Sequence, residues 1–287
     1  MAHLEDLMEC RNGGLMTRRG FVAAAVAAGL TLATSGCSGS GSTDSAQTAQ
    51  TDSYSLVTPG KLTVAWQDGY PPMEALNTST NVPEGYDVDM ITKLAEKLGL
   101  TVEYLSTMHF DAIIPTIKQG GKADVGVSSF TITDARRQEI DFTDPYIDSN
   151  QSIVTRADAT ADTADALNAA DKKIAVESGT TGEAWADENL SAATIVKLDD
   201  IVQCMTGTQT GLYDAVVCDL PVLAWECKNS YTDLKVAVEI PTGEQYGIVV
   251  SKDNPGLTQA LNEGLAEMTS AGDLEALEVK WFGEKIS

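Results

Sequence analysis

A stretch that could bind an anion lies between residues 125 and 136, where an apolar strand gives way to a helix. The strand ends at Ser128 and Ser129, Thr131 follows, and Arg136 falls in the first turn of the expected helix. Hydroxyls, the free N–H groups of a helix start and a guanidinium fork all donate hydrogen bonds to a carboxylate. A second arginine follows Arg136, and such pairs are usually solvated, so the preceding hydroxyl residues are what favour a binding role.

A second candidate, Asp219, ends a strand in a stretch that resembles the first. Residues 121–127 and 211–217 both read G-x-x-D followed by an apolar strand. Open α/β sheets bind ligands in a crevice at the carboxyl ends of their strands, so these two strand ends could face one crevice. Two alternatives stay open: the repeat is two ordinary strand-to-helix corners, and Asp219 caps the helix that starts at Leu220.

Strands and helices alternate along most of the chain, which predicts an α/β protein. Strands are expected at 61–66, 101–104, 123–127, 151–155, 173–177, 194–197, 215–218 and 245–250. Helices are expected at 85–98, 111–119, 158–171, 179–190, 199–205, 220–228, 255–270 and 273–282, besides the one that begins at 133. If the last segments return to the first half of the fold, strands near 151–155 and 245–250 join two lobes and form a hinge.

The first 36 residues are predicted to be a signal peptide. Arg18 and Arg19 precede an apolar run, 21–32, that is too short to span a bilayer, and export by the twin-arginine or the general route stays open. Residues 34–37 resemble a lipobox, so Cys37 is expected to carry a lipid; the alternative is a cleavage site with an incidental cysteine. Residues 37–55 are expected to form a flexible tether. The protein is therefore expected outside the cytoplasm, held to the membrane only by its lipid.

The net charge of −23 belongs to the chain after the leader, because residues 1–36 carry three acidic and three basic side chains. Such a surface repels nucleic acid and anionic lipid headgroups, which are excluded as partners. The cysteines at 204, 218 and 227 share no metal-ligand spacing, so neither a metal nor a cofactor is expected. Buried free thiols are favoured over a disulfide, and the protein is expected to be a monomer.

The chain from about Lys61 to Gly283 resembles the polar amino-acid-binding proteins of bacterial ABC importers, relatives of the histidine, glutamine and lysine/arginine/ornithine binders. The motifs that carry the resemblance are Y-P-P-M-E at 70, G-Y-D-V-D at 85, F-D-A-I-I-P at 110, S-S-F-T-I-T-D-A-R at 128, D-F-T-D-P-Y at 141, E-S-G-T-T-G at 177, D-A-V-V-C-D at 214, Y-G-I at 246 and K-W-F-G at 280. The resemblance implies a two-lobe, type II periplasmic-binding-protein-like fold with a two-strand hinge. The implied lobes are 56–152 with 246–287, and 153–245, and the implied protein partners are the permease subunits.

The resemblance also implies how an amino acid's main-chain groups would bind. Arg136 would take the α-carboxylate, helped by Thr131 and by the N–H groups around Thr180 and Thr181. Asp219 would take the α-ammonium, together with the backbone around Ser129. An isolated buried charge is costly, and an amino acid carries two that need opposite partners, so an arginine and an aspartate suit it. As an alternative, the Gly-Thr-Thr-Gly sequence is an ordinary turn.

The ligand's side chain is expected to meet a second group of residues. Tyr70 and Phe110 would sandwich its stem, unless both are core aromatics. Gln67 stands where relatives that bind basic side chains commonly carry an acid. This difference argues against a lysine or arginine ligand. No second basic residue is evident to receive a side-chain carboxylate, which argues against glutamate, so a neutral polar amino acid is favoured.

Two other functions compete with transport. The resemblance extends to dehydratases that act on prephenate-like acids, for which Glu74 and His109 would be the acid and base. No further paired acid and base is evident, so we expect a binding protein and no catalysis. A ligand-sensing module is the other rival.

Overall fold

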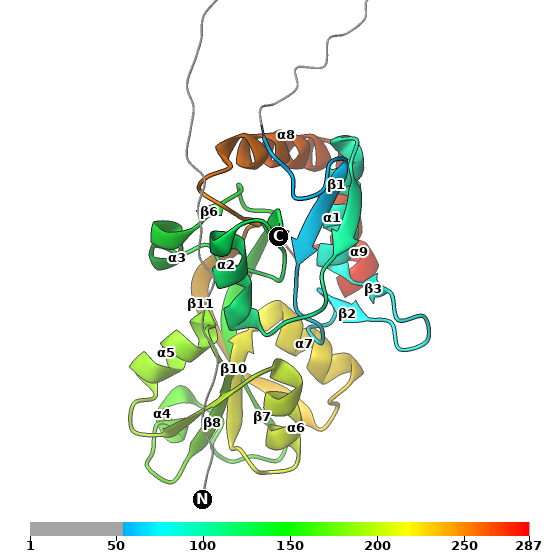
Figure 1. The fold of residues 1–287 in the computed structure, drawn as a ribbon. Coiled ribbons are helices and arrows are strands. Elements are labelled where there is room, and N and C mark those ends of the chain that lie inside the picture. Colours follow the sequence, from blue (N-terminus) through cyan, green and yellow to red (C-terminus); the bar gives the residue numbers. More distant parts are fainter. Residues whose placement is uncertain (1–53, 287) are drawn as a thin grey trace, which may run out of the picture. The chain divides into compact units, whose positions relative to one another are not determined.

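The computed structural model describes residues 54–286, and in this range the chain is an α/β protein with two five-stranded sheets (Figure 1). The predicted signal peptide, Cys37 and all but the last two residues of the predicted tether lie outside the described residues. From residue 54 to residue 286, no helix combines the length and the apolar character that crossing a bilayer requires.

The first sheet has the strand order β4-β1-β5-β12-β6. Its strands are β1 (Lys61–Ala65), β4 (Thr101–Tyr104), β5 (Val125–Gly126), β6 (Asp141–Phe142) and β12 (Val249–Val250). β1, β4 and β5 run parallel, whereas β12 is antiparallel to both β5 and β6. The carboxyl ends of the parallel strands therefore lie along one edge of this sheet, which is where its polar loops begin.

Different helices cover the two faces of the first sheet. These helices are α1 (Tyr86–Lys97), α2 (Phe110–Gln119), α3 (Asp134–Glu139), α8 (Pro255–Ala271) and α9 (Asp273–Phe282). Side chains alternate along a strand, so Leu62 and Val64 join the core with α1, α8 and α9, whereas Ala65 packs with Ile113 and Ile117 of α2. We call this sheet and its helices the first lobe.

The second sheet has the order β11-β7-β10-β8-β9. Its strands are β7 (Ile147–Arg156), β8 (Lys173–Glu177), β9 (Thr194–Leu198), β10 (Ala215–Asp219) and β11 (Leu234–Tyr246). The helices of this half are α4 (Ala164–Leu167), α5 (Thr181–Asn189), α6 (Ile201–Gln209) and α7 (Leu220–Asn229). β8, β9 and β10 are parallel, and we call this sheet and its helices the second lobe.

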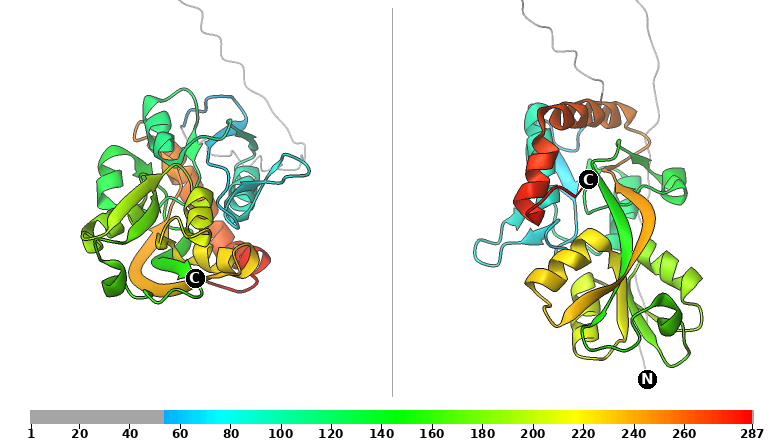
Figure 2. Two further views of the ribbon diagram at one scale, coloured as in Figure 1. Left: turned by 90° about the horizontal axis from the view of Figure 1, so that it is seen from below. Right: turned by 180° about the vertical axis from the view of Figure 1, so that it is seen from behind.

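The chain passes between the two sheets twice, through residues 143–146 before β7 and through residues 247–248 after β11. β7 and β11 pair antiparallel from Arg156 and Leu234 to Ile147 and Tyr246, and Figure 2 shows them side by side from behind. The two passages are close in space because this pairing continues up to them. The predicted lobe boundaries at 152/153 and 245/246 stay predictions.

The sequence did not predict four of the strands, which are β2, β3, β6 and most of β11. A strand was expected at 245–250, but the chain forms β11 up to Tyr246 and a separate β12. The turn-like residues 241–243 lie in a bulge of β11, where the register slips between Ile240 and Glu244. A small hairpin of β2 (Ala75–Leu76) and β3 (Pro83–Glu84) was also unpredicted, because two-residue strands leave no periodic pattern.

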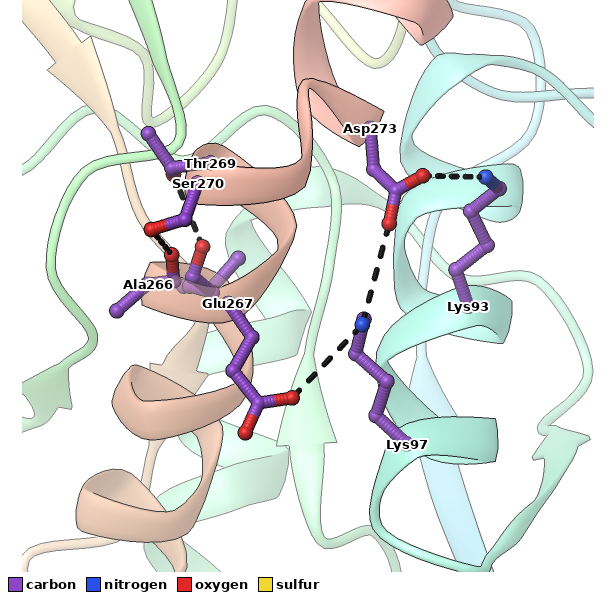
Figure 3. A network of polar contacts seen from close by, with 8 residues as sticks. Lys93, Lys97, Ala266, Glu267, Thr269, Ser270 and Asp273 are labelled. Carbon is purple, nitrogen blue, oxygen red and sulfur yellow. Dashed lines mark hydrogen bonds and ion pairs between the residues drawn. The ribbon is translucent and has the colours of Figure 1, made fainter.

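A group of ion pairs joins α1 to the last two helices (Figure 3). Lys93 lies 3.1 Å from Asp273, and Lys97 lies 3.9 Å from the same carboxylate and 3.8 Å from Glu267. These side chains remain partly exposed, so each pair contributes no more than about 1 kcal/mol to stability. Within the first lobe, these contacts join the two C-terminal helices to α1.

Candidate ligand-binding site

One cavity of about 20 Å³ lies where the strand ends of both lobes meet. All ten residues predicted from the sequence line it, together with two glutamates: Gln67, Tyr70, Glu74, Phe110, Ser128, Ser129, Thr131, Arg136, Glu177, Thr180, Thr181 and Asp219. The first lobe supplies residues that follow β1 and β5 and the starts of α2 and α3, and the second lobe supplies the ends of β8 and β10 and the start of α5. The structure therefore brings the predicted residues together, although their roles stay predictions.

Arg136 lies near the start of α3, as the sequence predicted, and the Thr133 side chain caps that helix by accepting a hydrogen bond from the Arg136 N–H at 3.1 Å. The guanidinium donates to the carbonyls of Thr131, at 2.8 Å, and Gly179, at 2.9 Å. Its carbon lies 5.3 Å from the ring centre of Phe110, within cation–π range. Arg136 thus spans from the first lobe to the second.

Gly179 lets the two lobes approach closely beside Arg136. Its φ is +80°, a conformation that other residues rarely adopt, and a Cβ at this position would lie 3.0 Å from the Cβ of Asp111 at the start of α2. A side chain here would push the α5 loop away from the first lobe.

Asp219 is buried at the end of β10 and does not cap α7 with its side chain. Its carboxylate accepts hydrogen bonds from the hydroxyls of Tyr70, at 2.8 Å, and Tyr246, at 2.6 Å, and from the amide nitrogen of Gln151. Burial raises the pKa of Asp219 to about 6, against the effect of these three donors. The side chain therefore faces the cavity as an ionised carboxylate at neutral pH.

The hydroxyls of Thr131 and Thr181 donate to a glutamate that the sequence did not single out. Glu244 accepts from Thr131 at 3.0 Å and from Thr181 at 2.8 Å. The Thr180 hydroxyl is engaged elsewhere: it accepts from the N–H of Glu183 at 3.0 Å and so caps α5. No sequence pattern marked Glu244, because it follows a bulge in a strand that was only partly predicted.

Gln67 and Glu177 meet across the cavity from opposite lobes. The Gln67 amide donates to the Glu177 carboxylate at 2.6 Å. Glu177 is only 2 % exposed, and burial raises its pKa to about 8. Glu177 was not among the predicted site residues, although its place at the carboxyl end of β8 matches that of Asp219 on β10.

Glu74 lies at the first-lobe side of the cavity, where the Ser128 hydroxyl donates to it at 2.6 Å. Burial and the nearby Asp87 carboxylate raise the pKa of Glu74 well above its usual range. His109, the base of the rival enzyme hypothesis, is exposed at the start of α2 and does not line the cavity. Glu74 and His109 are therefore not assembled as an acid and base at this site.

Within residues 54–286, no group of His, Cys, Asp and Glu side chains could hold a metal ion. Cys204 and Cys218 are buried free thiols and Cys227 is a half-buried one, as favoured from the sequence.

Comparisons with known proteins give consistent matches. Residues 62–284 match the bacterial extracellular solute-binding proteins, family 3. A probable histidine-binding protein of Neisseria gonorrhoeae is 30% identical over 275 residues, which cover 94% of this chain and 98% of that protein. The L-cystine-binding protein TcyJ of Escherichia coli K12 is 29% identical, covering 79% of this chain and 85% of that protein.

Solved structures of amino-acid-binding proteins also match this chain. An ancestral arginine-binding protein bound to arginine has a TM-score of 0.73 and 33% identity, covering 78% of this chain and 99% of that one. An ancestral arginine-binding protein bound to glutamine gives the same TM-score and identity, covering 79% of this chain and all of that one. The predicted α/β, two-lobe periplasmic-binding-protein-like fold is confirmed. The curated relatives are named as binding proteins, in agreement with the expected absence of catalysis.

Proposed function

This chain belongs to the bacterial extracellular solute-binding proteins of family 3, and we propose that it captures an L-amino acid between its lobes for an ABC importer. The observation that carries the proposal is that Arg136 and Asp219, opposite charges from different lobes, line one cavity. A zwitterion supplies both complementary charges, and no partner with a single charge would satisfy both residues. The names of the histidine-, cystine- and arginine-binding relatives support the same class of ligand.

In this proposal the α-carboxylate binds Arg136, Thr131 and the start of α5 at Thr180 and Thr181, and the α-ammonium binds Asp219. Arg136 already directs two donors at carbonyl oxygens beside the cavity, so exchanging them for a carboxylate needs only a small movement. Tyr70, which donates to Asp219, keeps that carboxylate facing the cavity. We call the ligand-contacting part of this set the main-chain end of the cavity: Ser128, Ser129, Thr131, Arg136, Thr180, Thr181 and Asp219.

We propose that Gln67, Glu177, Tyr70 and Phe110 form the side-chain end, which receives a neutral polar side chain. The Gln67 amide is uncharged, and Glu177, with its pKa of about 8, is largely protonated at neutral pH. Together they offer hydrogen-bond donors and acceptors without a fixed charge. A cationic amino acid is the second candidate, favoured by Glu177 and Glu74 in the lining and by the arginine-binding relatives.

Capture requires the lobes to separate. A cavity of about 20 Å³ holds roughly one water molecule, whereas small-molecule sites usually span about 300–1,000 Å³. We propose that the lobes, 56–152 with 246–287 and 153–245, rotate about the strands that join them. Opening breaks the Gln67–Glu177, Tyr70–Asp219 and Arg136–Gly179 contacts, and a bound amino acid replaces them as the link between the lobes.

For delivery, we propose that residues 1–36 direct export, that Cys37 carries the lipid and that residues 37–55 tether the monomeric protein near the permease. Labelling cells with a radioactive fatty acid tests this: the wild type is expected to take up label and Cys37→Ser is not. Equal labelling of both would contradict the lipid site.

A thermal-shift screen of the purified protein against the common L-amino acids at pH 7 tests the ligand class. A ligand at one hundred times its Kd stabilises the folded state by about 2.7 kcal/mol, enough for a clear shift. We expect a neutral polar amino acid to give the largest shift. If no amino acid stabilises the protein, the proposed function is contradicted. If arginine or lysine gives the largest shift, the ligand is the second candidate, a cationic amino acid.

A further inference from the structure

A carboxylate of the protein itself occupies part of the main-chain end. Glu244 accepts hydrogen bonds from the hydroxyls of Thr131, at 3.0 Å, and Thr181, at 2.8 Å, and from the Gln151 amide, at 3.1 Å. Thr131 belongs to the first lobe, Thr181 to the second, and Glu244 to β11, which leads to the passage between them. Three donors from three different segments thus converge on a single half-buried carboxylate.

The bulge in β11 is what aims Glu244 at these hydroxyls. Ile240 pairs with Gln151 and Glu244 with Ser149, so three residues of β11, 241–243, lie opposite the single residue Asn150 of β7. Bulges of this kind redirect a side chain and recur beside binding sites. Two residues further on, the Tyr246 hydroxyl donates to Asp219 at 2.6 Å, so the same strand serves the same end of the cavity twice.

We propose that Glu244 is an internal competitor for the ligand's α-carboxylate, and therefore a residue that sets affinity; this rests on the proposed function. Glu244 holds the Thr131 hydroxyl, which the proposed function assigns to the ligand's carboxylate, and it also holds the Thr181 hydroxyl at the start of α5, where that carboxylate would bind. Two carboxylates on the same donors repel each other, so the ligand must displace Glu244 to bind. In the absence of ligand, the Glu244 carboxylate links the two lobes in the closed form. When an amino acid binds, its α-carboxylate takes the place of the Glu244 carboxylate on these donors.

Because the ligand must displace Glu244, it binds only those molecules whose hydroxyl donors are free. The apparent Kd is therefore the intrinsic Kd divided by the fraction of such molecules. If Glu244 holds the donors in about nine molecules of ten, the apparent Kd is about tenfold higher than the intrinsic one. Removing the competing carboxylate restores that factor. A structural residue without this role would, on removal, leave affinity unchanged or weaken it.

Calorimetric titration with the amino acid found in the thermal-shift screen tests the proposal on Glu244→Ala and Glu244→Gln. We expect Glu244→Ala to bind about tenfold more tightly than the wild type, and Glu244→Gln, which keeps an acceptor without the charge, to gain less. Glu239→Gln is the matched control, because Glu239 is an exposed acid of the same strand, and its affinity is expected to stay at the wild-type value. Thermal melts establish that each variant is folded.

Unchanged or weaker binding by both Glu244 variants would overturn the inference, and a loss would identify Glu244 as a second acceptor for the α-ammonium. Arg136→Ala separates this from a failure of the proposed function. If the wild type binds and Arg136→Ala does not, the function stands whatever Glu244 does. If the wild type binds no amino acid, both the function and the inference fall.

Discussion

The two ends of the cavity differ in how firmly their charges are fixed. At the main-chain end Arg136 is permanently charged and Asp219, with a pKa of about 6, is ionised at neutral pH. At the side-chain end Glu177 has a pKa of about 8 and its partner Gln67 is neutral. Fixed opposite charges suit the main-chain groups that all amino acids share, whereas a site that adjusts its protonation suits selection among side chains. Changes at the first end should therefore abolish binding, and changes at the second should alter selectivity.

The largest effect is expected for Arg136→Ala, which leaves the ligand's carboxylate without a cationic partner. Removing one member of a buried charge pair costs about 2–5 kcal/mol of binding free energy. Calorimetric titration measures it, with Arg137→Ala as control because that exposed neighbour lies outside the cavity lining. Equal affinities for the two variants would remove the proposed distinction between the ends.

A somewhat smaller loss is expected for Asp219→Asn, because asparagine keeps an acceptor for Tyr70 and Tyr246 while losing the charge. We expect about 2–3 kcal/mol weaker binding. Wild-type affinity should also fall as the pH drops through about 6, where Asp219 takes up a proton, and the Asn variant should lack this step. Calorimetric titrations of both proteins at pH 5, 6 and 8 measure the loss of affinity and its pH dependence. If Asp219→Asn binds as tightly as the wild type, Asp219 has only a structural role.

The side-chain end predicts a different pH response, visible in stability. Between the ordinary pKa of 4.5 and the folded value of about 8, folded Glu177 keeps a proton that the unfolded chain releases, so stability falls as the pH rises through this window. The Glu177→Gln variant cannot ionise at this position, so its free energy of unfolding should exceed that of the wild type by about 1–2 kcal/mol at pH 9 and match it near pH 4. The difference at pH 9 is smaller than the full pKa shift would give, because opening of the lobes exposes Glu177 in part.

Urea unfolding of both proteins at these two pH values measures the difference, with the exposed Glu188 of α5 changed to Gln as control. The Glu177 variant should also reorder the amino acids in a thermal-shift screen while leaving Arg136 essential. A stability difference independent of pH would contradict the assigned protonation.

The smallest effect is expected far from both ends, for Asp273→Ala, which removes the ion pairs with Lys93 and Lys97 (Figure 3). The stability loss should be no more than about 1 kcal/mol and should shrink in 1 M salt. Ligand affinity should not change, and titration together with urea unfolding checks both. A marked loss of affinity would mean that the site is coupled to the outer helices.

The main-chain end was easier to predict from sequence than the side-chain end for a physical reason. Ser128 and Asp219 lie at the ends of apolar strands and Arg136 lies in the first turn of the helix after one of them, so local patterns place all three. Glu177 also ends a strand and could have been found in the same way, but its importance depends on the Gln67 partner from the other lobe. Such a contact is set by how the lobes meet, which no local pattern records.

Local sequence patterns could not predict that Glu244 lies at the site. Residues 241–243, Pro-Thr-Gly, are typical of a turn, yet they lie in a bulge within β11 that is held by its pairing with β7. The register of that pairing, which decides where Glu244 points, is a tertiary property.

The central claim is that opposite charges from two lobes bind the main-chain groups of one amino acid. Its most direct test is calorimetric titration of the wild type with the amino acid found by screening and with the α-amide of that amino acid, which lacks the carboxylate charge. We expect the amide to bind at least about thirtyfold more weakly, the equivalent of about 2 kcal/mol lost at Arg136. Equal binding of the two compounds would contradict it.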